Sequence, residues 1–296
     1  MTAGLSGIFP MLVTPFDESG AVALDELSMV TNYQLRAGVS GVSILGLAAE
    51  AETLTVDERT AIVRRVLSTA DGIPVIVGCS AGRTVDTVLL AQKAAEAGAA
   101  AVMVAPSVSG DWSREQLIEH YAAVARAIDP IPLMVQDAPA FVGVALDPIF
   151  VQELARAHAN VQYAKPESVP ASDAVATLAQ LPSMGVFGGH GGLYFMDVLE
   201  AGADGLIPGC EQPLAFQRIY TRWTSNDRAS ARLEFERLLP LLVWQFQSLP
   251  CFIACVKTLL HAKGLLAHPS LRGRSWPLSS GSQGILLNYA RRTDVA

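Results

Sequence analysis

The sequence of 296 residues lacks the features that would assign it to several common functional classes. It has no uninterrupted apolar run of about 18 residues, the length that a membrane-spanning helix needs. Its first residues lack the basic segment that begins a secretory signal. The net charge is -7 and no segment interleaves basic with aromatic residues, which argues against nucleic acid as a partner. We therefore expect a cytoplasmic protein that acts on a small molecule, with no membrane partner.

Cysteine is scarce and is not arranged for metal binding or crosslinking. The four cysteines are Cys79, Cys210, Cys251 and Cys255. They form no paired C-x-x-C set and have no histidine cluster near them, which argues against a zinc site and against a disulfide framework. We expect four buried thiols and no metal.

Short apolar runs alternate with helical patterns along most of the chain, which is typical of βαβ units and a parallel sheet. The runs occupy residues 8–13, 42–45, 75–77, 101–104, 131–135, 161–164, 186–187 and 205–207. Thr55 with Glu58, and Ser113 with Gln116, have the spacing of a capping box at a helix start. A glycine that can end a helix recurs at positions 38, 98 and 202.

Eight such units over about 200 residues predict a (β/α)8 TIM barrel in residues 1–210. A doubly wound open sheet is the alternative, but no G-x-G-x-x-G follows the first run. Residues 211–296 predict a C-terminal helical extension, with helices at 213–224, 226–246 and 250–263. No linker rich in Gly, Ser or Pro precedes it, so we expect it to pack on the barrel. Its stripe of Leu239, Leu242 and Phe246 predicts core or a subunit interface.

In a barrel, catalytic side chains come from the carboxyl ends of the strands. The candidates are residues 46–52, Gln136 and Asp137, Lys165 and Glu167, and residues 188–192 around His190. Lys165 is a possible Schiff-base nucleophile, and an ordinary ion pair or a solvated rim charge is the alternative. A paired carboxylate would keep the proton on the amine. We therefore expect a catalytic Lys165 to have Glu167 pointing across the cavity rather than paired with it.

Three motifs, in this order and spacing, resemble the family of class I pyruvate-type aldolases and dehydratases typified by dihydrodipicolinate synthase and N-acetylneuraminate lyase. Residues 7–16 are similar to the first-strand motif that ends in Thr-Pro-Phe. Residues 46–50 with Thr53 and Leu54 are similar to the Gly-Thr-Thr-Gly-Glu segment, and residues 163–165 to the strand with the Schiff-base lysine. The resemblance implies a 2-keto acid substrate, no cofactor, Lys165 as the nucleophile and a homo-oligomer, tetramer or dimer.

Several polar groups of that family have no counterpart in this chain. Its two threonines correspond to Leu47 and Ala48, its catalytic tyrosine to Gln136, and the arginine that binds a second carboxylate to Phe141. The tyrosine that a neighbouring subunit usually lends falls within residues 106–109, which contain none. The synthase reaction and sialic acid cleavage are therefore not expected. Three segments resemble instead the branch that dehydrates 2-keto-3-deoxy sugar acids, in particular 2-keto-3-deoxyarabonate dehydratase. They are the Lys-x-Glu pattern at residues 165–167, the Gln-Asp-Ala-Pro turn at residues 136–139 and the glycine-rich loop at residues 188–192.

In such a dehydratase Lys165 condenses with the C2 ketone, and Glu167 removes a C3 proton before the C4 hydroxyl leaves. The candidate substrate contacts are Ala48, Ala49, Glu50, Gln136, Asp137, Gly189 and His190. Glu50 more simply holds its loop through backbone amides, Asp137 could orient Gln136, and His190 could be a satisfied loop histidine. An aldolase that uses the same lysine is an alternative function. A catalytically inactive keto-acid sensor is another.

Overall fold

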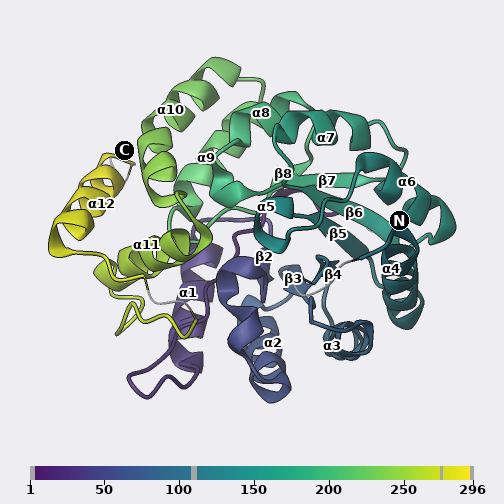
Figure 1. Cartoon of the computed structure of the whole chain (residues 1–296). Coiled ribbons are helices and arrows are strands. Elements are labelled where there is room, and N and C mark those ends of the chain that lie inside the picture. Colours follow the sequence, from purple (N-terminus) through teal and green to yellow (C-terminus); the bar gives the residue numbers. More distant parts are fainter. Residues whose placement is uncertain (1–3, 108–111, 274–275, 294–296) are drawn as a thin grey trace.

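The computed structural model describes residues 4–107, 112–273 and 276–293. Eight parallel strands form a nearly closed barrel surrounded by helices (Figure 1). The strands are β1 (Gly7–Ile8), β2 (Val42–Ile44), β3 (Val75–Gly78), β4 (Ala101–Val104), β5 (Leu133–Asp137), β6 (Val161–Pro166), β7 (Gly185–Gly188) and β8 (Gly205–Leu206). Their order is β1-β8-β7-β6-β5-β4-β3-β2. The predicted TIM barrel is confirmed.

The first strand is shorter than the predicted run over residues 8–13. Pro10 has no N–H to donate to a neighbouring strand, so the regular ladder stops before it. The chain continues as an irregular extended segment that closes the ring, because Met11 forms parallel bridges with both Ser43 and Gly209. The Leu12 amide donates to the Ser43 carbonyl at 2.8 Å. The prediction was therefore right about the path of the chain but wrong about the length of the strand.

The helices of the barrel alternate with its strands along the chain. They are α1 (Leu24–Arg36), α2 (Val56–Ala70), α3 (Thr84–Ala97), α4 (Arg114–Ile128), α6 (Pro148–Ala157), α7 (Ala171–Leu178) and α8 (Phe195–Glu200). Both predicted capping boxes are present, at the starts of α2 and α4. Shorter turns follow the strands, namely η1 (Leu47–Ala49), η2 (Ala51–Thr53), α5 (Pro139–Val142) and η3 (His190–Gly192). These turns lie at the carboxyl ends of the strands, where the candidate site residues are.

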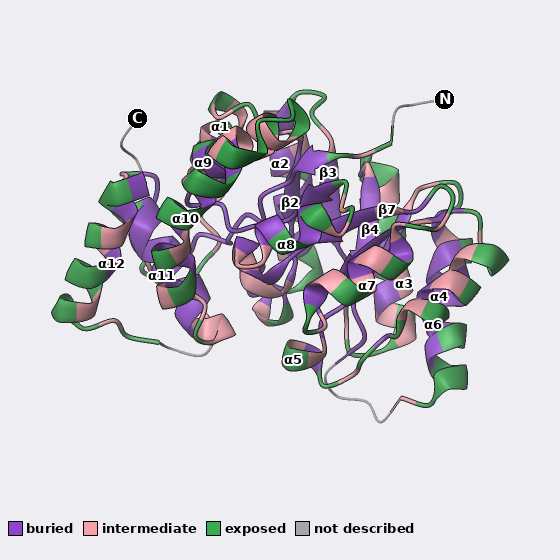
Figure 2. Ribbon diagram, turned by 90° about the horizontal axis from the view of Figure 1, so that it is seen from above, coloured by how far each residue is buried: buried purple, intermediate pink, exposed green. Residues whose placement is uncertain are grey.

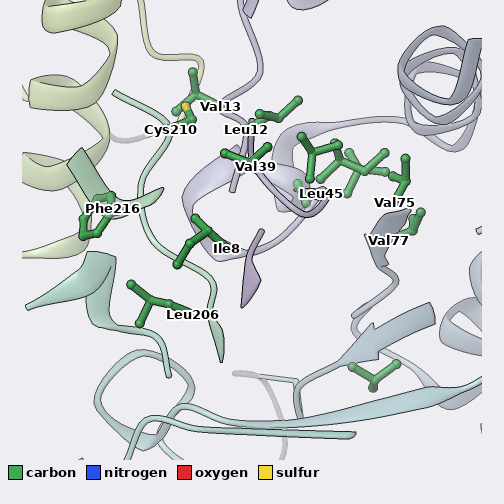
Figure 3. Close-up of a cluster of buried hydrophobic side chains, with 14 of the residues drawn as sticks. Ile8, Leu12, Val13, Val39, Leu45, Val75, Val77, Leu206, Cys210 and Phe216 are labelled. Atoms are coloured by element: carbon green, nitrogen blue, oxygen red, sulfur yellow. The ribbon is translucent and has the colours of Figure 1, made fainter. Parts of the chain in front are cut away.

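Two buried clusters fill the barrel and its surroundings. The smaller cluster occupies the barrel interior and includes Phe9, Met134 and Tyr163. The larger cluster, part of which Figure 3 shows around Ile8 and Leu206, lies between the strands and the helices. Figure 2 shows the same arrangement from above, with buried strands inside helices whose outer faces are exposed. Successive side chains on a strand alternate between these two clusters.

The C-terminal extension contains α9 (Pro213–Thr224), α10 (Arg228–Gln245), α11 (Leu249–Ala262) and α12 (Ser280–Thr293). The first three agree with the predicted helices, and α12 was not predicted. It packs against α10 and α11 beside the barrel (Figure 1). None of the described helices is by itself long and apolar enough to cross a membrane. The α10–α11 pair, bent by 119°, has the length and composition of a membrane span only when its two helices are taken together. All four cysteines are buried free thiols, as predicted.

Candidate active site

Lys165 and Glu167 lie side by side at the mouth of the barrel. Lys165 is the next-to-last residue of β6, and Glu167 directly follows the strand. Side chains two residues apart on an extended chain point to the same side, so both face the barrel axis, as Tyr163 does. The Lys165 Nζ is 2.9 Å from Glu167 Oε2, and the two side chains are 8% and 5% exposed. The expectation that Glu167 points across the cavity rather than pairing with Lys165 is wrong.

Three donors and one glycine fix the Glu167 carboxylate. Besides Lys165, Gln136 donates from Nε2 to Oε2 at 2.7 Å, and the His190 amide donates to Oε1 at 2.7 Å. A Cβ at Gly189 would lie 2.2 Å from Glu167 Oε1, so this position requires glycine. The backbone of the glycine-rich loop at residues 188–192 therefore lies close to the Glu167 carboxylate. Gln136, Gly189 and His190, three of the predicted contacts, are brought together around one carboxylate.

The surroundings of Glu167 favour its ionised form despite deep burial. Burial by itself raises the pKa of Glu167, because a charge is costly away from water. The charge of Lys165, the His190 N–H and the Gln136 amide oppose burial, and the pKa of Glu167 lies below its ordinary value. The site thus holds a carboxylate that can accept a proton, in contact with the Lys165 amine.

A small cavity of about 40 Å³ lies directly above this pair. Such a volume has room for little more than one or two water molecules. Its lining is Met11, Leu47, Ala48, Gln136, Phe141, Lys165, Glu167, Gly191, Ile207, Pro208, Phe246, Leu249 and Phe252. Phe246, predicted as core or interface, lines the cavity together with Leu249 and Phe252. No local pattern in the sequence predicts that the extension reaches this site, because the contact joins segments far apart in the chain.

The turn η1 brings Leu47 and Ala48 to the cavity. Ala48 lines the cavity, whereas the Ala49 amide donates to the Gly46 carbonyl at 3.0 Å within the turn. The Ala49 carbonyl in turn accepts from Thr14 Oγ1 at 2.7 Å. The first N–H groups of a helical turn have no partner within it, and Ala48 is in that position. Of the two predicted contacts Ala48 and Ala49, Ala48 is the one that lines the cavity.

Glu50 lies away from the cavity, in a buried ion pair with the extension. Its Oε1 is 2.5 Å from Lys257 Nζ, and its Oε2 accepts from the amides of Arg272 and Gly273, both at 2.8 Å. Burial lowers the pKa of Lys257, and the charge of Glu50 opposes that effect. This arrangement corresponds to the alternative in which Glu50 holds its loop through backbone amides. Its carboxylate joins the loop after β2 to α11 and the segment beyond it.

Asp137 also points away from the cavity, because it follows Gln136 on the same strand and so faces the opposite side. Its Oδ1 accepts from the Leu146 amide at 2.8 Å, and its Oδ2 accepts from the Ser168 hydroxyl. Burial and the nearby charge of Glu167 raise the pKa of Asp137. Asp137 therefore braces the loops after β5 and β6, behind the pair of Gln136 and Glu167.

The His190 ring stands among aromatic side chains, two of which, Phe141 and Phe246, line the cavity. Its centroid is 5.0 Å from that of Tyr194, 6.0 Å from Phe246 and 6.4 Å from Phe141. Burial lowers the pKa of His190, which favours the neutral imidazole. Its Nδ1 is buried and has no hydrogen-bond partner among the described residues. A buried polar atom of this kind ordinarily has a partner. The cavity lining does not include His190, so its contact with a substrate stays a prediction.

Two further predictions concern the neighbouring subunit's tyrosine and a metal site. Residues 108 and 109, where a neighbouring subunit's tyrosine would have its counterpart, fall outside the described residues. Within the described ranges, no group of three or more His, Cys, Asp or Glu side chains is arranged to hold a metal ion.

Comparisons with known proteins place this site in a family. The family model described as "Dihydrodipicolinate synthetase family" matches residues 4–286. The chain belongs to the dihydrodipicolinate synthetase family. This family comprises Schiff-base lyases, aldolases and dehydratases, and the chain is an enzyme of that class.

Relatives within the dihydrodipicolinate synthetase family match almost the whole chain. L-2-keto-3-deoxyarabonate dehydratase of Azospirillum brasilense is 32% identical over 295 residues, covering 97% of this chain and 94% of that protein. 4-hydroxy-tetrahydrodipicolinate synthase of Bacillus subtilis is 29% identical over 258 residues, covering 86% of this chain and 88% of that protein. The solved structure of YagE, a prophage protein of Escherichia coli K12 in complex with pyruvate, has a TM-score of 0.92 and 25% identity, covering 99% and 100% of the two chains.

Proposed function

We propose that this enzyme dehydrates a 2-keto-3-deoxy sugar acid similar to 2-keto-3-deoxyarabonate, through a Schiff base on Lys165. The observation that carries the proposal is the 2.9 Å contact between the Lys165 amine and the Glu167 carboxylate. Leu47, Ala48 and Gln136 occupy the positions of the hydroxyl groups that the resemblance leads one to expect. Glu167 is thus the acid or base nearest to the reacting carbon atoms. The 32% identity to a dehydratase of this kind supports the same conclusion.

The contact with Glu167 gives Lys165 a direct route to the neutral amine. As the keto acid enters, the proton moves from Nζ to Oε2 along their hydrogen bond, and the free amine attacks the C2 carbonyl. Glu167 then returns that proton to the carbinolamine oxygen, which leaves as water. The iminium that forms keeps its positive charge beside the carboxylate. The contact between Lys165 and Glu167 therefore serves to move the proton.

The same carboxylate performs the second proton transfer. The iminium acidifies the C3 hydrogens, and Glu167 removes one to give the enamine. The enamine electrons then expel the C4 hydroxyl, which takes the proton from Glu167 and departs as water. Loss of a C5 proton and protonation at C3 convert the resulting unsaturated iminium into the enol of a C5 aldehyde. Hydrolysis of the iminium then frees Lys165. The net change is the loss of one water molecule, with every carbon atom retained.

Other residues bind and orient the substrate in this proposal. The amide of Ala48 binds the C1 carboxylate, since a turn N-terminus accommodates an anion. Gln136 and Gly189 hold the Glu167 carboxylate in position through a hydrogen bond and close packing. His190, whose Nδ1 has no partner among the described residues, contacts a hydroxyl on the far part of the substrate. These roles require no metal or organic cofactor, because the iminium is the electron sink.

Product analysis by mass tests this proposal and separates it from the aldolase alternative. Incubation with 2-keto-3-deoxypentonate should give a keto acid semialdehyde lighter by one water, with all carbons present. Pyruvate and an aldehyde would instead identify an aldolase. Borohydride added with pyruvate should reduce the Schiff base and leave a covalent adduct on the intact protein. An adduct that survives in Lys165→Ala would refute the role of Lys165. If wild type forms no adduct, that result would also refute the role of Lys165 and would favour the inactive sensor.

A further inference from the structure

A second buried acid, Glu211, lies in the loop after β8, outside the site described above. Its Oε1 accepts a hydrogen bond from Gln245 Nε2 at 2.7 Å. Gln245 is the last residue of α10, and both side chains are 0% exposed. The bond therefore joins the loop after β8 to the end of α10, entirely away from water.

Two polar atoms of this pair have no partner, and a single proton would satisfy both. Glu211 Oε2 and Gln245 Oε1 are buried and without a hydrogen bond among the described residues. Two acceptor oxygens cannot bond to each other, but a protonated carboxyl is a donor. With a proton on Oε2, Glu211 donates to Gln245 Oε1 while its own Oε1 accepts from Nε2. The two planar groups then share two hydrogen bonds, as buried polar groups ordinarily do.

The surroundings of Glu211 favour the neutral carboxyl. Burial raises the pKa of Glu211, and the charge of Lys263 at the end of α11 opposes this only in part. The thiols of Cys210, on the same loop, and Cys255, on α11, also face Glu211, and burial raises the pKa of both, which keeps them uncharged. From α1, Tyr33 donates to the Glu211 backbone carbonyl at 3.3 Å.

The pair joins two segments that line the active-site cavity. Pro208, in the loop that leads to Glu211, and Phe246, next to Gln245, are both part of the lining. A Cβ at Gly209 would lie 2.2 Å from Glu211 Oε2, so the carboxyl packs directly against this loop. The contact between Glu211 and Gln245 therefore holds one part of the lining against another.

We propose that Glu211 is protonated in the folded enzyme, that it shares two hydrogen bonds with Gln245, and that this acid–amide pair positions Pro208 and Phe246 at the active site. Glu211 is thus a positioning residue that does not touch the substrate. Loss of its proton would place an acceptor opposite the acceptor Oε1 of Gln245, and one of the two bonds would be lost. The positioning rests on the proposed function, whereas the protonation does not.

Glu211→Gln tests the protonated state, because the glutamine amide has a donor and an acceptor where the protonated carboxyl has them. The unfolded chain releases the Glu211 proton near the ordinary pKa of 4.5, and the folded chain keeps it to a higher pH. Above pH 4.5, the folding equilibrium constant of wild type should therefore fall about tenfold per pH unit relative to that of the variant, until the folded carboxyl itself ionises. Urea titrations of both proteins measure this ratio. A ratio that stays constant as the pH rises would overturn the inference.

Infrared difference spectroscopy gives a second readout of the proton that depends on neither stability nor activity. The spectrum of wild type minus that of Glu211→Gln should contain the C=O stretch of a protonated carboxylic acid at neutral pH. Other carboxyl groups, such as that of Asp137, are present in both proteins and cancel. Carboxylate stretches in place of that band would show that the folded Glu211 is ionised and would overturn the inference.

Glu211→Met and Glu211→Gln form a matched pair for the positioning role. Both remove the titratable group, but only glutamine can restore the two hydrogen bonds with Gln245. We expect kcat/KM to stay within about threefold of wild type in Glu211→Gln and to fall at least about tenfold in Glu211→Met, chiefly through kcat. Both variants should keep the borohydride adduct with pyruvate, because Lys165 is unchanged. Equal kcat/KM in the two variants, at equal folded fraction, would show that the pair does not position the site.

The outcomes separate this inference from the proposed function. Absence of the borohydride adduct at Lys165 in wild type would refute the proposed function, while the urea titrations and the infrared band would still decide whether Glu211 is protonated. An adduct in wild type together with a constant folding ratio and carboxylate stretches would refute the acid–amide pair alone. Neither the titrations nor the band depend on whether Glu211→Met folds.

Discussion

Replacing Glu167 with glutamine probes the proposed mechanism most directly, because it removes the charge and the base while keeping the shape. In the wild type, Oε2 accepts from Lys165 and Gln136 while Oε1 accepts from the His190 amide. Glutamine offers one oxygen and one NH2 group at these two places. Either orientation places the NH2 group against a donor. At least one of the three hydrogen bonds must be lost.

The structure sets the size of the expected effects. Leaving one buried donor without its partner costs about 1–3 kcal/mol, so Glu167→Gln should unfold at a lower urea concentration but remain folded. Loss of a general base lowers turnover by about 10²–10⁴-fold. Adduct formation should be slower but should persist, because solvent water can replace Glu167 in the condensation but not as the base positioned at C3. The variant should therefore accumulate a substrate adduct that it cannot dehydrate.

Turnover and borohydride trapping of the same samples provide the measurement. Asp137→Asn is the matched control, since it neutralises another buried carboxylate in the same layer whose oxygens contact Leu146 and Ser168 rather than the cavity. We expect the control to dehydrate substrate at near the wild-type rate. Near-normal turnover in Glu167→Gln would show that the base lies elsewhere. Equal losses of adduct and turnover would show that Glu167 acts at condensation only.

Three further predictions concern stability. Lys257→Met should lower the free energy of unfolding by about 3–5 kcal/mol, because it leaves Glu50 buried without its cation, and adding Glu50→Gln should recover part of that loss in urea titrations. The Arg272 hydrogen bond lowers the pKa of Glu58 to about 2, so Glu58→Gln should cost about 1 kcal/mol near neutral pH, after allowance for solvent screening. That difference should vanish as the pH falls from 4.5 toward 2, and a constant difference would contradict the assignment. Burial raises the pKa of Glu211 above its ordinary value of 4.5. The stabilising contribution of the protonated carboxyl is therefore present below pH 4.5 and is lost as the pH rises. Glu211→Gln should then gain stability relative to wild type in alkaline melting curves.

The barrel could be predicted because its signals are local. Strand runs, capping boxes and helix-ending glycines each lie within a few residues, and the structure reproduces them. The first strand was predicted too long because a run of apolar residues does not reveal which amides join a ladder, and Pro10 has none to give. Helix α12 escaped prediction because Gly281 and Gly284 weaken its helical tendency and its partners, α10 and α11, lie elsewhere in the sequence.

The site was predictable in part for the same reason. Lys165, Glu167 and Gln136 stand at strand ends, so the topology brings them together. The contact between Lys165 and Glu167 follows from the two-residue period of a strand, yet reasoning from proton affinity alone led to the opposite expectation. Phe246 and Phe252 could not be assigned, because their place depends on how the extension folds back over the barrel mouth.

The pairing of Lys165 with Glu167 has a further consequence if the proposed mechanism holds. An isolated charge in an apolar cavity is costly, so a favourable mechanism keeps the pair neutral overall. The ammonium with the carboxylate, the iminium with the carboxylate, and the enamine with the carboxylic acid all satisfy this condition. Each step between these states moves one proton or forms one covalent bond, and the net charge of the pair does not change. A base placed across the cavity would separate these charges at every step. A carboxylate in contact with the lysine can therefore replace a longer hydroxyl relay in a site whose other walls are apolar.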